Sequence, residues 1–329
     1  MKKIHMLGIA VALLLTGCQS TTVDTEVQPD QEQPVIEIEV PSSTETSDEE
    51  VTIDDSVVVS DVHEWTASDE ETLQAFVKDA DAVSIEEAKA LLDEKIKDTS
   101  SMIADEYVAY YQERLINELN ETSNLFFEDT IQQELVDGFD YGYFSRDELQ
   151  SFQNKEIVAM IDPLYEIGYK VEISEGMYYP IVDYSVLYQY EDYVTNGVKK
   201  YLQLKKRESD IMAYSDAAII VPWSEMADRL LMSEDLLDVH LPESMKKRNE
   251  EEFKWALASY VYGTNNTPVF RYEDMKMSDD EILESFKLVA ETGGDRVKAV
   301  MVPYLKVLEE ENYVGTDKVY ETLHGLLNN

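Results

Sequence analysis

Hydrophobic residues recur every three or four positions along most of the chain from Trp65 onward. The clearest stripes are Ile85-Ala88-Leu92-Ile96, Ile103-Tyr107-Tyr111-Leu115-Leu119, Val297-Val300-Tyr304-Leu308 and Val319-Leu323-Leu326. This spacing places the apolar side chains on one face of an α-helix that packs against its neighbours. The sequence contains only 12 Gly and 9 Pro, and scarce helix breakers favour long helices over a many-turned β architecture. The pattern predicts an all-α, or nearly all-α, multi-helix globular domain.

Four short sequence motifs predict where individual helices begin. In each, a serine is followed three residues later by a glutamate: Ser68 and Glu71, Ser84 and Glu87, Ser145 and Glu148, Ser278 and Glu281. This is the spacing of a capping box, in which the two side chains bind free backbone amides in the first helical turn. We therefore expect a helix to start after each of these serines.

One interval departs from the helical pattern. Residues 169–173 alternate between apolar and polar side chains, residues 174–176 have the composition of a turn, and residues 177–179 can form a returning strand. Alternation followed by a glycine-containing turn is typical of a β-hairpin. We expect a hairpin at 169–179 and, because proline is favoured in the first helical turn, a helix that starts at Pro180.

The N-terminal segment has the pattern of an export signal. Lys2 and Lys3 precede an apolar run over residues 4–15. A helix of this length is about 18 Å long, well short of the roughly 30 Å hydrocarbon core of a membrane. The run therefore matches the hydrophobic region of a signal peptide better than a membrane span.

Leu15, Thr16, Gly17 and Cys18 end this run and resemble the lipobox of bacterial lipoproteins at every position. The resemblance covers residues 1–18. It implies that residues 1–17 are cleaved and that the Cys18 thiol carries a diacylglycerol, with palmitate-type acyl chains, on the extracytoplasmic face of the cell membrane. Two acyl chains provide stable anchoring. The alternative is an ordinary secretory signal that leaves Cys18, the one cysteine of the chain, as a free thiol.

The remaining chain divides into a tether and a folded domain. Residues 18–61 are rich in Thr, Ser, Gln, Asp and Glu, lack Lys and Arg, and cannot bury enough apolar area to fold, so we expect a disordered acidic tether. Residues 62–329 form the helical domain. Asp162-Pro163 suggests a subdomain boundary near residue 162, because the residue before proline is biased away from helix. The formal net charge of −42 excludes nucleic acid as a partner.

The hairpin and the segment after it form the first candidate ligand-binding site. Its residues are Glu172, Glu175, Tyr178, Tyr179, Asp183 and Tyr184, with Trp223 further along the chain. Aromatic rings beside carboxylates can bind a sugar or a cation by stacking, hydrogen bonding and cation–π contact. The alternative is that tyrosines at helical spacing are core residues, since the chain contains 21 Tyr and 69 acidic residues that will cluster by chance.

A degenerate calcium loop is the second candidate. Asp137, Ser145 and Glu148 occupy positions 1, 9 and 12 of a twelve-residue loop of the kind that binds calcium between two helices. Phe139 and Tyr141 stand where two oxygen ligands are needed, which should weaken any binding severely. The Ser145–Glu148 capping box explains the same residues without a metal.

Two basic clusters stand out in this acidic chain, one at residues 199–207 and one at 246–248. They either mark where an anionic partner docks or are solvated helix faces that balance nearby acids.

No motif for a known catalytic chemistry is present. The sequence lacks H-E-x-x-H, G-x-S-x-G, a P-loop and a dinucleotide fingerprint, and the only cysteine is assigned to the lipid. We therefore expect a non-enzymatic protein without a cofactor that binds a ligand or an envelope protein or glycan partner. An envelope-glycan hydrolase or lyase that uses carboxylates is the first alternative, and a structural spacer protein is the second.

Overall fold

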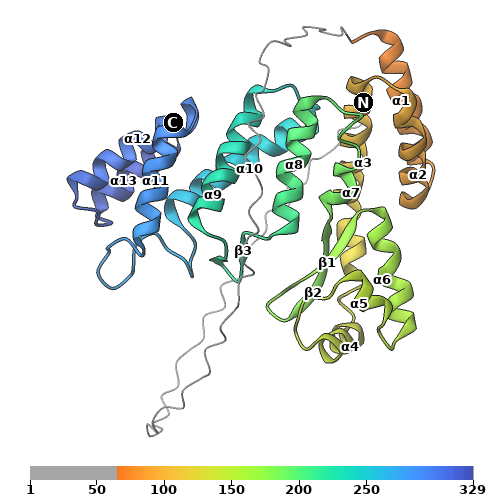
Figure 1. The fold of residues 1–329 in the computed structure, drawn as a ribbon, viewed down its shortest axis with the longest axis horizontal. Coiled ribbons are helices and arrows are strands. Elements are labelled where there is room, and N and C mark those ends of the chain that lie inside the picture. Colours follow the sequence, from red (N-terminus) through yellow and green to blue (C-terminus); the bar gives the residue numbers. More distant parts are fainter. Residues whose placement is uncertain (1–64, 329) are drawn as a thin grey trace, which may run out of the picture. The chain divides into compact units, whose positions relative to one another are not determined.

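The computed structural model describes residues 65–328 of the chain (Figure 1). These residues belong to one compact unit, Asp61–Asn329. The signal peptide expected at 1–17, the lipobox with Cys18 and the tether expected at 18–61 lie outside the described residues.

The described part of the chain is mostly α-helical, as the hydrophobic pattern predicts. In the first half the elements are α1 (Ala67–Asp81), α2 (Ile85–Lys95), α3 (Ser101–Asn124), α4 (Asp129–Phe139), α5 (Arg146–Gln150), α6 (Lys155–Ile167), β1 (Tyr169–Ser174), β2 (Met177–Val182), α7 (Tyr184–Tyr188) and α8 (Asn196–Asp210). The second half contains β3 (Tyr214–Ser215), β4 (Ala218–Ile219), α9 (Trp223–Asp235), α10 (Glu243–Tyr262), α11 (Asp280–Thr292), α12 (Asp295–Glu310) and α13 (Asp317–Leu327). Short 3₁₀ turns follow α2 and α9, at Ile96–Asp98 and Leu236–Asp238.

Two of the four predicted capping boxes are confirmed. Ser84 and Ser145 accept hydrogen bonds from the amides of Glu87 and Glu148, whose carboxylates bind back to the serine amides. The other two predictions are wrong in position by one or two residues.

A competing cap lies next to each misplaced serine. Helix α1 is capped by a Thr66–Asp69 box, and α11 is capped by Asp279. Threonine and aspartate are also favoured capping residues, so the sequence offers more than one starting point at each of these two helices.

The predicted hairpin is confirmed: β1 and β2 pair in antiparallel register across a two-residue turn at Glu175-Gly176. Both turn residues have positive φ angles, 52° and 76°, as the tight hairpin turns that match strand twist require. The helix predicted at Pro180 is wrong, because β2 continues to Val182 and α7 begins only after its cap, Asp183.

The register explains why proline is tolerated in β2. Ser174 and Met177 flank the turn as a hydrogen-bonded pair, and hydrogen-bonded and non-hydrogen-bonded pairs alternate along an antiparallel ladder. Val171 and Pro180 therefore form a non-hydrogen-bonded pair, so the missing N–H of Pro180 removes no bond to β1.

The subdomain boundary expected near residue 162 is not observed. Asp162 and Pro163 lie inside α6, which is continuous from Lys155 to Ile167. The buried residues instead form two hydrophobic clusters. The first comes mainly from α1–α8 and the hairpin, and the second from the β3–β4 segment and α9–α13. Helix α10 contributes to both, with Met245 in the first cluster and Phe253 in the second.

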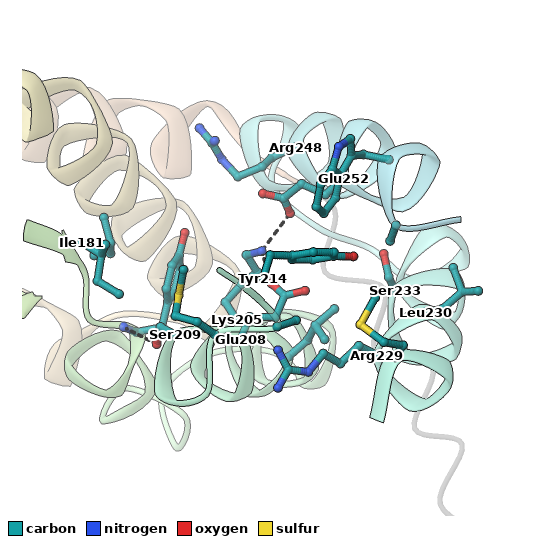
Figure 2. Close-up of a pocket in the computed structure, with 18 of the residues that line it drawn as sticks. Ile181, Lys205, Glu208, Ser209, Tyr214, Arg229, Leu230, Ser233, Arg248 and Glu252 are labelled. Atoms are coloured by element: carbon teal, nitrogen blue, oxygen red, sulfur yellow. Dashed lines mark hydrogen bonds and ion pairs between the residues drawn. The ribbon is translucent and has the colours of Figure 1, made fainter. Parts of the chain in front are cut away.

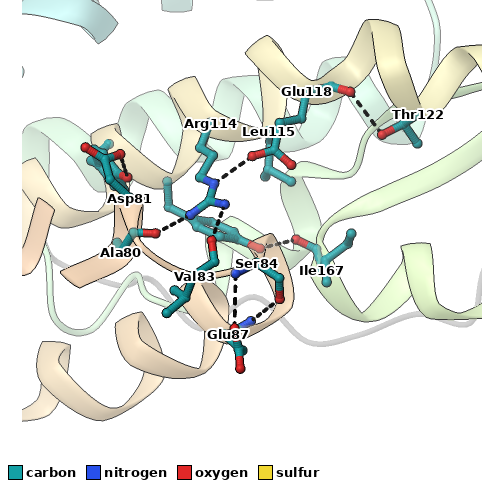
Figure 3. A network of polar contacts seen from close by, with 12 residues as sticks. Ala80, Asp81, Val83, Ser84, Glu87, Arg114, Leu115, Glu118, Thr122 and Ile167 are labelled. Carbon is teal, nitrogen blue, oxygen red and sulfur yellow. Dashed lines mark hydrogen bonds and ion pairs between the residues drawn. The ribbon is translucent and has the colours of Figure 1, made fainter. Parts of the chain in front are cut away.

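Helix α3 is fixed in the first cluster by polar contacts as well as by packing (Figure 3). Its Arg114 guanidinium donates hydrogen bonds to the carbonyls of Ala80 and Val83, which lie at the end of α1 and just before α2. Tyr111 donates its hydroxyl proton to the carbonyl of Ile167, at the end of α6, over 2.7 Å. These bonds hold α3 between three other helices.

None of the helices within residues 65–328 is both long and apolar enough to cross a membrane.

Candidate functional site

A cavity of about 520 Å³ lies where the two hydrophobic clusters meet. Five elements supply most of its walls: β2, α7, α8, α9 and α10, with two residues of α3. The lining residues are Ile116, Leu119, Ile181, Val182, Tyr184, Leu204, Lys205, Glu208, Ser209, Met212, Ala213, Tyr214, Met226, Arg229, Leu230, Ser233, Arg248, Glu252, Trp255 and Ala256. The volume and the mostly apolar walls are typical of small-molecule sites.

One buried charge in the cavity is a lysine between two carboxylates. The Lys205 ammonium contacts Glu208 on the same helix and lies 2.9 Å from Glu252 on α10. A dashed line in Figure 2 marks the contact with Glu252. It also lies 5.9 Å from the centre of the Tyr184 ring. Burial opposes the charged form of Lys205, but the two carboxylates outweigh burial and raise the pKa of the ammonium above its usual value. Lys205 therefore carries its charge and links α8 to α10.

Arg229 is the second buried cation, with 6% of its surface exposed. Its Nε donates to Glu225 over 2.7 Å and its Nη1 donates to the Ile211 carbonyl over 2.9 Å. Its Nη2 has no hydrogen-bond partner among the described residues, although the atom is buried. A buried donor without a partner costs about 1–3 kcal/mol, so this nitrogen is a site that a ligand can satisfy.

Arg248 is the third cation of the wall, and it is turned toward α3. Its Nη2 donates to Glu113 over 2.8 Å, and Figure 2 shows its guanidinium pointing away from that of Arg229. Burial opposes the charge here too, while Glu113 and other neighbours raise the pKa of Arg248 overall. The Arg248 Nε is a further buried nitrogen without a partner in the described chain.

Three aromatic side chains complete the walls. Tyr184 is buried, and burial raises the pKa of its hydroxyl to about 12. Tyr214 and Trp255 meet edge to face with their ring centres 4.6 Å apart. Trp255 lines the cavity although 57% of its surface is exposed, so the cavity opens to solvent beside this ring.

Of the seven residues proposed from the sequence, Tyr184 lines the cavity and the others lie elsewhere. Glu172 and Tyr179 face each other across the hairpin, and Glu175 forms its turn. Burial raises the pKa of Glu172. Asp183 caps α7 by accepting the amide hydrogen of Ser185.

Two of the proposed aromatic residues belong to the core. Tyr178 is buried and donates its hydroxyl proton to the Gly142 carbonyl over 2.8 Å. Trp223 is buried in the second cluster against Tyr260 and Phe286. The structure therefore brings together Glu172, Glu175 and Tyr179 at the hairpin, and places Trp223 in a different core.

The residues of the degenerate calcium loop have structural roles. Asp137 lies within α4 and accepts a hydrogen bond from Gln133, while Ser145 and Glu148 form the capping box of α5. Within residues 65–328, no group of three or more His, Cys, Asp or Glu side chains is arranged to hold a metal ion. The capping interpretation accounts for these residues.

The sequence contained a partial signal for the charged side of the cavity. Lys205 and Arg248 belong to the two basic clusters, each of which contributes one residue to the wall. Arg229 was not predicted as a site residue from the sequence, although it lies between Met226 and Leu230 on the buried face of α9. A charged residue on the apolar stripe of a helix is itself a signal, because such residues are rarely buried without a partner.

No family model, curated protein or solved structure matches the chain. The chemistry of the cavity is therefore the basis for proposing a function. Its apolar walls, its internal ion pair and its incompletely bonded guanidinium are the properties that a ligand must match.

Proposed function

We propose that this chain is a lipid-anchored protein of the cell envelope whose folded domain binds a small, mostly apolar ligand in the cavity between α8, α9 and α10. The observation that carries the proposal is the cavity itself: about 520 Å³ with largely apolar walls and a few buried polar groups. Sites that enclose small organic molecules combine these properties.

The anchor rests on the resemblance of Leu15-Thr16-Gly17-Cys18 to a lipobox. A lipid on Cys18 would place the domain on the extracytoplasmic face of the membrane, where amphiphilic molecules are abundant. A Cys18→Ser variant should leave the membrane fraction, and a variant that remains there as fully as the natural chain would contradict the anchor.

The arrangement of charges favours binding over hydrolysis. Glu208 and Glu252 lie close enough to contact the same ammonium, that of Lys205. A glycoside hydrolase needs one carboxyl group as a proton donor and the other as a base or nucleophile. Here both carboxylates are bound to one buried lysine, which suits a structural ion pair in a binding site. The cavity also favours a binding protein over a spacer, which needs no concave site.

Filling the cavity is the test of the proposal. Ala256 lies on the wall contributed by α10, and a tryptophan at this position would occupy the space. Ala290 is a matched control, because it is also a half-buried helical alanine but lines a separate groove on α11. The neutral fluorescent probe N-phenyl-1-naphthylamine should bind the full chain, and Ala256→Trp should weaken it at least about tenfold, the loss of about 1.4 kcal/mol.

The control variant Ala290→Trp should bind the probe within about twofold of the natural chain. Absence of probe binding to the natural chain, or equal binding by both tryptophan variants with intact helical circular dichroism, would refute the cavity as the binding site.

A further inference from the structure

The unpartnered nitrogen of Arg229 suggests what kind of ligand the cavity takes. We infer that the ligand is an amphiphile with one anionic group, and that the Nη2 of Arg229 binds this group while the apolar body fills the rest of the cavity. This inference rests on the proposed function, since it concerns the same cavity.

The first step is the geometry of the guanidinium. An arginine side chain offers five N–H donors in a fixed plane and stays protonated. In Arg229, the Nε and Nη1 sides are bonded to Glu225 and to the Ile211 carbonyl, which leaves Nη2 free. The residue is more than nine-tenths buried and lines the cavity, and Figure 2 shows its guanidinium reaching from α9 toward the α8 side. Nη2 itself has almost no accessible surface, so an acceptor inside the cavity completes its hydrogen bonding when the guanidinium shifts toward the cavity.

The second step is the charge of the wall. Three cations and two carboxylates line the cavity, whereas the whole chain has 27 basic and 69 acidic residues. Lys205 is paired with both carboxylates of the wall, and Arg248 is paired with Glu113.

Arg229 is paired with a carboxylate, Glu225, that does not line the cavity. Glu225 binds Arg207 as well as Arg229. Arg207 is also paired with Asp228, so these two arginines face two carboxylates. Arg229 differs from Lys205 in having an unbonded nitrogen, and from Arg248 in not being turned toward α3. A single anionic group matches this arrangement, whereas a cationic ligand does not.

The third step is the remainder of the wall. Met226 and Leu230 lie on α9 with Arg229, Met212 follows Ile211, whose carbonyl Arg229 binds, and all three line the cavity. Methionine side chains adapt to ligands of irregular shape. An acyl chain or a fused aromatic ring with a carboxylate or sulfonate at one end would place its charge at Arg229 and its body against these residues.

A pair of probes that differ by one anionic group separates this inference from the proposed function. N-phenyl-1-naphthylamine is neutral, and 8-anilinonaphthalene-1-sulfonate has the same rings with an added sulfonate. The full chain should bind the sulfonate probe more tightly than the neutral one. Arg229→Gln should weaken binding of the sulfonate probe at least about tenfold. Its affinity for the neutral probe should stay within about twofold of that of the natural chain.

Arg207→Gln is the matched control, because Arg207 bonds to the same Glu225 but does not line the cavity. It should change the affinity for either probe by less than about threefold. Glu225→Gln is a second variant, and its expected effect is opposite to that of Arg229→Gln. It removes the carboxylate partner of Arg229 and should increase the affinity for the sulfonate probe. Near-UV circular dichroism must show that this variant keeps its tertiary packing, because 8-anilinonaphthalene-1-sulfonate also binds partly unfolded chains.

Equal affinity of the natural chain for the two probes would overturn the inference, as would a sulfonate preference that survives Arg229→Gln. Either result leaves the cavity as a binding site for neutral molecules. Failure of both probes to bind the natural chain would instead overturn the proposed function.

Discussion

The hairpin region and the cavity both gather tyrosines and carboxylates, but they differ in how their polar groups are bonded. In the hairpin, Gln132 donates to the Tyr178 carbonyl and accepts from the Tyr178 amide, at 2.7 and 2.9 Å. The Tyr178 hydroxyl is bonded to Gly142. In the cavity, Lys205 is fully engaged, whereas the Arg229 Nη2 is buried with no partner in the described chain.

This difference separates groups that hold the fold from a group that is available to a ligand. Buried polar groups are nearly always hydrogen-bonded, and those of the hairpin obey the rule within the chain itself. An exception such as Arg229 requires an explanation, and a binding role supplies one. Substitutions around Tyr178 should therefore change stability and leave binding intact, whereas a substitution of Arg229 should mainly change binding.

The largest stability effect is expected from Tyr178→Ala. The ring is buried against Phe144, with centres 5.5 Å apart, and removing a large buried aromatic side chain costs about 3–5 kcal/mol. Urea unfolding would measure the loss, with Tyr178→Phe as the control that loses only the hydroxyl bond, worth about 1 kcal/mol.

Affinity of the folded Tyr178→Ala variant for N-phenyl-1-naphthylamine should match that of the natural chain. A loss of unfolding free energy below about 1 kcal/mol for the alanine variant, or a large drop in its affinity for the probe, would contradict the distinction between the two regions.

A smaller and pH-dependent effect is expected at Asp105, which connects α3 to α8. Asp105 lies on α3 and accepts hydrogen bonds from the amide and hydroxyl of Thr195, the residue that starts α8, at 2.8 and 2.7 Å. Burial raises the pKa of this carboxyl to about 6, although the bonds from Thr195 and the nearby His240 act to lower it.

The sign of the effect follows from proton binding. A carboxyl whose pKa is higher in the folded state than in the unfolded chain binds protons more tightly when folded, so it stabilises the fold as the pH falls through 6. Between about pH 7 and about pH 5 the natural chain should gain about 1 kcal/mol of unfolding free energy relative to Asp105→Asn, which cannot titrate. Urea unfolding of both proteins at the two pH values measures this difference. A difference that is constant with pH would show that Asp105 does not titrate in this range.

The sequence predicted those features that depend on neighbouring residues. The helical stripes, the Ser84 and Ser145 caps and the turn at Glu175-Gly176 are all local, and the structure confirms them. The errors at Pro180 and Asp162-Pro163 arose because proline preferences are local tendencies, which strand register and helix packing can override.

The cavity could not be predicted in the same way, because its walls meet only in the folded chain. Leu119, Val182, Lys205, Arg229 and Glu252 come from five different elements. The charge pattern identified two basic clusters, but it could not show that Lys205 turns inward while its neighbour Lys206 pairs with Asp210 at the surface. The break in the helical pattern led to a predicted ligand-binding site at the hairpin. The cavity is instead formed mainly by α8, α9 and α10, whose sequences show no such break.

Hydrogen–deuterium exchange of the full chain with and without N-phenyl-1-naphthylamine tests the central claim most directly. Bound probe should slow exchange in peptides from α8, α9 and α10 and leave the tip of the hairpin, residues 172–179, unchanged. Slower exchange confined to the hairpin peptides, with none in the three helices, would contradict the assignment of binding to the cavity.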